Sequence, residues 1–142
     1  MNKKEALKIV QENGWALEDL DDNFKKDEEI VLEAVKQDGG NLDYANKNFK
    51  KDKKFILKAL KLSSYALRFA DKSFKKDKKI VLKAVNKNGI VLCYVNKSLR
   101  KDKEIVLAAV TQSAANSGNL EYVLEYVDVS LRNDPDILAI LN

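Results

Sequence analysis

The sequence predicts an all-α fold, a short α-solenoid of tandem 25-residue two-helix repeats, and three observations support this prediction. First, the stretch FKKDKKIVLKAVNKNGIVLCYVNKS at 74–98 recurs in edited form at 24–48, at 49–73 and from residue 99. Second, each copy places apolar residues at i, i+1, i+4 and i+5, which is typical of a buried helix face. Third, no stretch alternates with a period of two, so no sheet is expected.

The 142 residues are predicted to form a single helical-repeat domain, because a 25-residue unit buries its apolar face only by stacking on its neighbours. The repeats lie at 1–23, 24–48, 49–73, 74–98, 99–130 and, in part, 131–142. The repeat at 99–130 carries a seven-residue insertion, expected within the Ser/Asn/Gly cluster 113–119.

In the degenerate first repeat, Trp15 stands where later copies have Gly40, Tyr65 and Ile90. An aromatic side chain at this position is expected to close the exposed end of the stack.

The first helix of each repeat is expected to begin directly after an aspartate, whose carboxylate can accept hydrogen bonds from free N–H groups. These aspartates are Asp27, Asp52, Asp77 and Asp102, and Asp134–Pro135 opens the last helix. Gly39 and Gly89 are expected to end the helix as left-handed C-caps, and Ser63–Ser64 replaces this signal in the third copy.

A shorter second helix is expected to follow in each copy. Its apolar positions lie at i, i+3 and i+7, as in Leu42, Ala45 and Phe49. Phe49 and Phe74, which end this pattern in successive copies, are expected to wedge between helix pairs.

The repeated pattern is a Phe or Leu, a basic residue, Lys-Asp, two charged residues, an Ile-Val-Leu-x-Ala-Val run, a glycine four residues later and Leu-x-Tyr. This pattern resembles the tandem repeats of the domain of unknown function 4116 family over nearly the whole chain, weakly at 1–23 and in the insertion. The resemblance implies an array-forming repeat, found in secreted effectors of intracellular bacteria and in algal and protist proteins. It brings no catalytic or ligand residue and favours an interaction module.

The composition excludes several classes of protein. With 45% apolar and 34% charged residues, the chain is too apolar for disorder and too charged for a membrane span. It has no histidine and one cysteine, which excludes histidine-based catalytic triads, most zinc sites and an intramolecular disulfide. We therefore expect a protein that is not an enzyme, with no catalytic, cofactor-binding or metal-binding residues and no membrane partner.

Two further groups of residues are expected to have no special role. The N-terminal acids lack the spacing of a calcium loop. Cys93 is expected to face solvent as an incidental thiol, with a reactive thiol beside a basic patch as the alternative. The N-terminus does not have the pattern of a signal peptide, so we expect a cytoplasmic protein, or one delivered into a host cell by a specialised secretion machine.

Charge is concentrated in the two central repeats. Residues 49–73 hold eight basic and two acidic residues, residues 74–98 hold seven and one, and every other repeat is net negative. If the repeats stack, equivalent lysines line up into one basic face. The candidate partner-binding residues are Lys50, Lys51, Lys53, Lys54, Lys58, Lys75, Lys76, Lys78, Lys79, Lys83, Arg100 and Lys101.

The functional hypothesis is a non-catalytic protein-binding helical-repeat module that docks through this face, with the 113–119 insertion, on a protein with an acidic surface. A bacterial effector or a phage-encoded inhibitor of a host protein is the expected setting. The alternative is nucleic-acid binding by the same face. Arginines are few, and Tyr44, Phe69 and Tyr94 follow the core periodicity, which disfavours base stacking.

Two other interpretations stay open. The lysines can be a solvated face that keeps an apolar stack soluble. The short C-terminal helix within 131–142 can leave an apolar end through which the protein self-associates.

Overall fold

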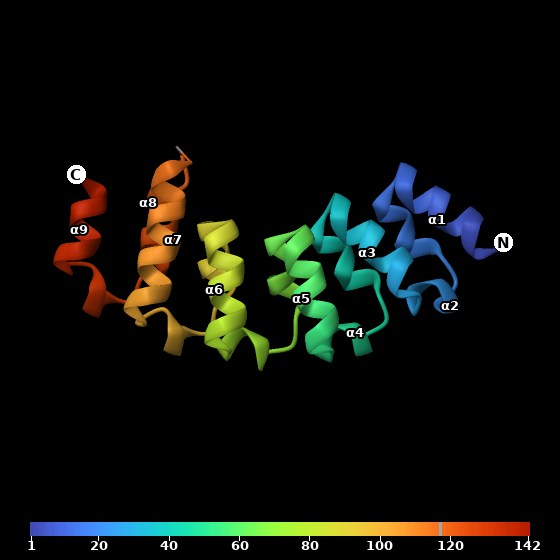
Figure 1. The fold of residues 1–142 in the computed structure, drawn as a ribbon, viewed down its shortest axis with the longest axis horizontal. Coiled ribbons are helices and arrows are strands. Elements are labelled where there is room, and N and C mark those ends of the chain that lie inside the picture. Colours follow the sequence, from blue (N-terminus) through green and yellow to red (C-terminus); the bar gives the residue numbers. More distant parts are fainter. Residues whose placement is uncertain (117) are drawn as a thin grey trace. The chain divides into compact units, whose positions relative to one another are not determined.

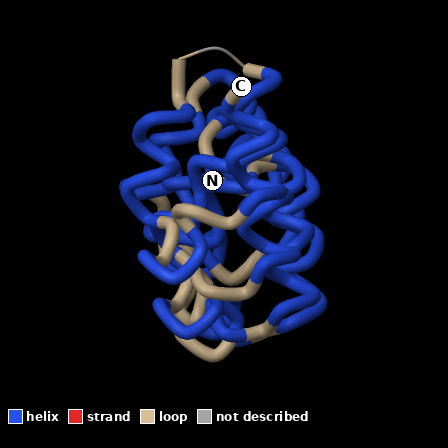
Figure 2. Tube along the Cα trace, turned by 90° about the vertical axis from the view of Figure 1, so that its left-hand side faces the viewer, coloured by secondary structure: helices blue, strands red, loops and turns tan. Residues whose placement is uncertain are grey.

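The computed structural model describes residues 1–116 and 118–142, and these form helices and loops with no strand (Figure 2). The predicted all-α repeat fold is therefore confirmed. The chain divides into two compact units, Met1–Asp71 and Lys72–Asn142, whose helices are labelled in Figure 1. One domain over 1–142 stays a prediction. No helix in the described part of the chain is long and apolar enough to cross a membrane.

Unit 1 (1–71) repeats one pattern: a ten-residue α-helix, a six-residue 3-10 helix and a short helical turn. Its long helices are α1 (Lys3–Glu12), α3 (Glu28–Gln37) and α5 (Lys53–Leu62). Its 3-10 helices are η1 (Gly14–Asp19), η2 (Gly39–Tyr44) and η3 (Ser64–Phe69). The short turns are α2 (Asp22–Lys25) and α4 (Asn48–Lys51). The predicted second helix is present only in part. The 3-10 helix η2 contains Leu42 but ends at Tyr44, Ala45 is extended, and Phe49 lies in the separate turn α4.

Unit 2 (72–142) continues the pattern and then departs from it. Its regular part is η4 (Phe74–Lys76), α6 (Lys78–Lys87), η5 (Gly89–Tyr94) and η6 (Lys97–Leu99). The remaining elements are α7 (Lys103–Ala115), α8 (Leu120–Tyr126), η7 (Val129–Leu131) and α9 (Pro135–Leu141). The long repeat extends α7 to 13 residues and replaces the 3-10 helix by α8. The predicted insertion, 113–119, begins inside the last turn of α7, and residue 117 lies outside the described residues.

The predicted N-caps are confirmed. Asp27 Oδ1 accepts hydrogen bonds from the N–H groups of Glu29 (3.0 Å) and Ile30 (3.2 Å). Asp52, Asp77, Asp102 and Asp134 also accept from backbone N–H groups at the starts of their helices. Each carboxylate satisfies donors that the helix leaves free and favours the positive end of the helix dipole.

The core of each unit is built from the predicted apolar stripe. In α3 this stripe is Ile30, Val31, Ala34 and Val35, all at 0% exposure. The equivalent side chains of α5, α6 and α7 are also buried, and each six-residue 3-10 helix (η1, η2, η3 and η5) adds a buried leucine such as Leu42. Full burial of one such branched side chain stabilises the fold by about 1.5–3 kcal/mol.

A backbone hydrogen bond joins the beginning and the end of each regular repeat. In unit 1, Asn46 N–H donates to the Lys25 carbonyl and Asp71 N–H to the Lys50 carbonyl, both at 2.9 Å. In unit 2, Asn96 N–H donates to the Lys75 carbonyl at 3.0 Å. These bonds fix how the chain leaves each repeat relative to where it enters.

The prediction that Gly39 and Gly89 adopt a left-handed conformation is wrong. The helices end at Asp38 and Asn88, each with φ −153°, and among the described residues only Gly118 has a positive φ, 116°. Glycine is needed because the next repeat lies too close for a side chain. A Cβ on Gly39 would lie 2.5 Å from Ser63 Oγ.

The same explanation holds for Gly89, where a Cβ would clash with the carbonyl oxygen of Ala109. Ser64 takes this position in the third copy, where it is buried with 4% of its surface exposed. A small side chain is therefore accommodated at this position of the third copy.

Candidate binding surfaces

Two basic residues precede the capping aspartate of each regular repeat, as in Lys25–Lys26, Lys50–Lys51 and Arg100–Lys101, and are called the basic pair. In these three pairs the first residue bonds to the protein itself. Lys25 Nζ donates to the Glu18 carbonyl at 2.7 Å, and Lys50 Nζ lies 2.9 Å from Asp43 Oδ1. Arg100 Nη2 donates to the Cys93 carbonyl at 2.8 Å. Each side chain reaches seven residues back, to the end of the preceding 3-10 helix. Lys50 and Arg100 therefore have a structural task.

Arg100 makes two further contacts. Its Nε donates to the Val95 carbonyl at 2.9 Å, and its guanidinium carbon lies 5.1 Å from the centre of the Tyr126 ring. Arg132, at the equivalent position, donates to the Val127 carbonyl at 3.2 Å. Both arginines are therefore directed onto the protein rather than toward a ligand.

The lysine at the first position of α6 links two repeats. Lys78 Nζ lies 3.0 Å from Asp102 Oδ2 and 2.8 Å from Glu104 Oε2. Lys3 and Lys103 make the same two-carboxylate contact with the repeat that follows them. The position therefore serves to clip successive repeats together.

The pKa values of these groups reflect the clip. Hydrogen bonds to Glu104 and then Asp102 raise the pKa of Lys78. Partial burial alone would raise the pKa of Asp102, but the hydrogen bonds from Lys78 and from the backbone outweigh it and lower that pKa. Both groups stay charged at neutral pH.

The other candidate lysines divide into two sets. Lys58 Nζ lies 2.5 Å from Glu28 Oε1, which links α5 to α3, and Lys53 and Lys75 also have partners in the protein. The exposed candidates are Lys51, Lys54, Lys76, Lys79, Lys83 and Lys101.

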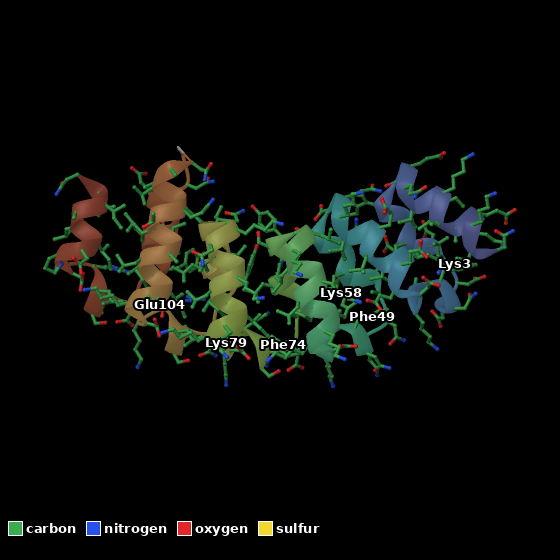
Figure 3. The ribbon with its side chains drawn as sticks, viewed as in Figure 1. Lys3, Phe49, Lys58, Phe74, Lys79 and Glu104 are labelled. Carbon is green, nitrogen blue, oxygen red and sulfur yellow. The ribbon has the colours of Figure 1, made fainter. Side chains whose placement is uncertain are left out.

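Exposed lysines gather on the outer faces of α5 and α6. Lys54, Lys58 and Lys61 lie at i, i+4 and i+7 on α5, and Lys79 and Lys83 share one face of α6. Figure 3 labels Lys58 on α5 and Lys79 at the N-terminal end of α6. In unit 1 the equivalent positions of α3 are Glu29, Glu33 and Lys36, and in unit 2 those of α7 are Glu104, Ala108 and Thr111.

These lysines also occupy unfavourable positions for a helix. The first turn of α5 holds Lys53 and Lys54, that of α6 holds Lys78 and Lys79, and neither has an acid. The first turns of α1, α3, α7 and α9 all contain one. Because the N-terminal end of a helix carries partial positive charge, lysine there opposes helix stability.

The outer face of unit 1 also carries an open groove of about 620 Å³. Leu32 and Leu62 supply its apolar surface, and charged residues of α1 and α3 surround them. Its carboxylates are largely paired: Asp27 and Glu29 with Lys3, and Glu28 with Lys58. Within residues 1–116 and 118–142, no group of side chains is arranged to hold a metal ion.

Trp15 does not close the end of the stack as expected. It is 57% exposed, and its ring centre lies 6.2 Å from that of Tyr44, at 54° between the planes. Sequence reasoning assigned both residues to packing. The signal it passed over is that Trp15 shares its repeat position with Gly40, so the fold itself needs no side chain there.

Cys93 is half-buried rather than facing solvent. Its thiol lies near Tyr122, whose hydroxyl lies 3.2 Å from that of Tyr126. The bond to Tyr126 and then the nearby Cys93 raise the pKa of Tyr122. The thiol therefore belongs to a polar cluster of unit 2 together with the stacked Arg100.

Comparison with known proteins finds one matching family model, described as Domain of unknown function (DUF4116). It matches residues 2–50, 27–75, 52–100 and 77–123. Successive matches begin 25 residues apart, which is the period of the repeat. No curated protein and no solved structure matches.

Proposed function

The chain belongs to the DUF4116 family of tandem repeats, and on that basis we propose that it is a non-catalytic module that binds a protein with an acidic surface. The contacts are the exposed lysines of α5 and α6. Of the candidates, Lys50, Lys78 and Arg100 are left out because the fold uses them. Lys58, which pairs with Glu28, is left out for the same reason, and so are Lys53 and Lys75, which also have partners in the protein. The narrowed set is Lys51 and Lys54 in unit 1 and Lys76, Lys79, Lys83 and Lys101 in unit 2.

One observation carries the proposal: lysines stand in the first turns of α5 and α6, where acids would stabilise the helix. The need for a soluble surface does not explain these lysines, because acidic side chains, which stand at the same positions in α3 and α7, keep a protein soluble equally well. A residue that opposes the stability of its own helix is expected where that residue serves the function of the protein. Attraction of an acidic partner is such a function.

Nucleic acid on the same lysines is the alternative proposal, and the geometry favours it less. Bidentate contacts to phosphates and bases use arginine. Arg100 and Arg132 are bonded to carbonyl oxygens, and the Arg68 guanidinium lies 5.3 Å from the centre of the Phe69 ring. The proposed setting, a cytoplasmic or host-delivered effector or a phage-encoded inhibitor, rests on the family alone.

The test compares two triple variants that lose the same charge. The first replaces outer lysines of α5 and α6: Lys54→Gln, Lys79→Gln and Lys83→Gln. The control replaces exposed lysines that share one repeat position elsewhere: Lys47→Gln, Lys72→Gln and Lys97→Gln. Fluorescence anisotropy then measures binding to labelled poly-glutamate and to a random DNA duplex between about 50 and 200 mM salt.

We expect the wild type and the control to bind poly-glutamate alike, and the α5/α6 variant to lose most of the affinity. Capture from lysate followed by mass spectrometry should then give a protein that the wild type and the control retain but the α5/α6 variant does not. Equal binding by both variants contradicts the proposed role of the α5 and α6 lysines. Tight duplex binding that falls steeply with salt favours the nucleic-acid alternative.

A further inference from the structure

The 3-10 side of unit 1 exposes an aromatic pair that the proposed function does not use. Trp15 is the second residue of η1, and Tyr44 is the last residue of the neighbouring η2. Their rings are tilted by 54° with centres 6.2 Å apart, and 57% of Trp15 remains exposed. The two rings therefore make a tilted contact at the surface of unit 1, with much of Trp15 exposed.

Packing does not account for this arrangement. The position of Trp15 is occupied by glycine in the next repeat, Gly40, so the repeat folds without a side chain there. An exposed tryptophan leaves a large apolar area in water, and Trp and Tyr dominate the binding energy of many interfaces. The pair thus has the character of a contact surface.

The surroundings of the pair are acidic. Partial burial raises the pKa of the Tyr44 hydroxyl, and three carboxylates raise it further. They belong to Glu18, Asp43 and Asp38. Two ammonium groups lie beside these carboxylates, since Lys25 donates to the Glu18 carbonyl and Lys50 pairs with Asp43. Three carboxylates against two ammonium groups still leave the surroundings net negative. Two aromatic faces within a field of carboxylates attract a cation.

We propose that Trp15 and Tyr44 form a docking site for an arginine side chain carried by a basic segment of a partner protein. A guanidinium group stacks on an aromatic face while its edge donates hydrogen bonds to carboxylates, and Glu18 and Asp38 supply these. The site has the opposite charge preference from the lysines of α5 and α6, so it stands independently of them.

The test uses Trp15 as its own reporter, because it is the only tryptophan in the chain. The probes are a blocked peptide of alternating arginine and glycine and the same peptide with citrulline, which keeps the shape of arginine but has no charge. Titration at low salt should change the Trp15 fluorescence, with the arginine peptide bound about tenfold more tightly than the citrulline peptide.

The variants assign the effect to the site. Tyr44→Leu keeps the reporter and should weaken binding about fivefold, whereas Tyr44→Phe keeps the ring and should bind normally. Glu18→Gln should weaken binding about twofold to threefold. The matched control is Tyr122→Leu, which makes the same change at an exposed tyrosine of unit 2. Circular dichroism checks that each variant is folded.

Three results would overturn the proposal: equal binding of the citrulline peptide, normal binding by folded Tyr44→Leu, or fluorescence that changes with protein concentration alone, which would mean that a second copy covers the pair. The α5/α6 variant, Lys54→Gln with Lys79→Gln and Lys83→Gln, should bind the arginine peptide like the wild type. If the arginine peptide does not bind to Trp15 and Tyr44, the proposed function of the α5 and α6 lysines is therefore not affected.

Discussion

Replacing Lys79 by glutamate should stabilise the protein and at the same time weaken its binding to an acidic surface. Lys79 is the second residue of α6, directly after Lys78, and the first turn of that helix has no acid. If the lysine is present for binding rather than for folding, its removal separates the two properties. Most surface substitutions would not improve one and impair the other.

The size of the stabilisation follows from the position. A charge in the first turn interacts with the helix dipole by about 0.3–1 kcal/mol. Charge reversal removes one unfavourable interaction and adds one favourable interaction, so the free energy of unfolding should rise by about 0.6–2 kcal/mol. For a chain of this length the thermal midpoint should then increase by about 2–8 °C at low salt.

The matched control is Lys83→Glu, which makes the same charge change in the middle of α6. Both variants lower the formal net charge from +4 by two, so relief of overall repulsion is the same in both. Thermal unfolding followed by circular dichroism should show the larger gain for Lys79→Glu, and the difference should shrink in about 0.5 M salt. A midpoint for Lys79→Glu at or below that of Lys83→Glu would refute the reasoning.

Three further predictions concern the contacts between repeats. Gly89→Ala should lower the free energy of unfolding, measured by urea denaturation, by about 1–3 kcal/mol, because the added Cβ would clash with the next repeat. The control, Gly40→Ala, lies in a more open position and should lower the free energy of unfolding much less. Arg100→Ala should cost about 1–2 kcal/mol through the lost hydrogen bonds to carbonyl groups, and Arg100→Lys should recover part of this; full stability of the alanine variant would contradict the structural role. Folding lowers the pKa of Asp102 below its ordinary 3.8, so as the pH falls the unfolded chain takes up a proton at this carboxylate before the folded chain does, and the free energy of unfolding decreases. Asp102→Asn should make this decrease shallower, measured as the urea midpoint from about pH 6 to about pH 2.5.

Local chemistry made much of the fold predictable. An aspartate directly before an apolar helical stripe is typical of an N-cap, which accepts hydrogen bonds from the free N–H groups of the first turn, and Asp27 does this. The stripe predicted at Ile30 and Val31 is buried for a similar reason, because burial is set by a spacing of a few residues. The 3-10 form of the second helix could not be read this way, because a six-residue element is shaped by the neighbours on which it packs.

The glycines show why some predictions fail. Glycine is required either for a positive φ or for close approach of another segment, and the sequence around it does not separate the two. At Gly89 the decisive atom belongs to Ala109, twenty residues further along the chain. A side chain at the same repeat position, Ser64, was the available hint that no left-handed conformation is needed there.

Adjacent lysines were equally hard to separate by sequence. In Lys50–Lys51 the first residue bonds back to the end of a 3-10 helix and the second is exposed, although the two residues are identical. The signal lay in the repeat alignment, where the first position becomes Arg100 and then Arg132. Arginine suits a position that must reach two carbonyl oxygens at once.

The basic residues fall into two groups, those that bond to a neighbouring repeat and those that the fold does not require. The first position of each basic pair is basic even in the net negative repeats, as in Lys25 and Arg100, and the clip position holds Lys3 and Lys103 in two of these repeats, so this charge serves the contact between repeats. In the net negative repeat 24–48 the clip position holds Glu28 instead. The outer positions of α5 and α6 behave differently. Lys54 and Lys79 correspond to Glu29 in α3 and Glu104 in α7. Because the same backbone accepts an acid at this position and is stabilised by it, we propose that the lysines of the central repeats are present for the partner that they attract.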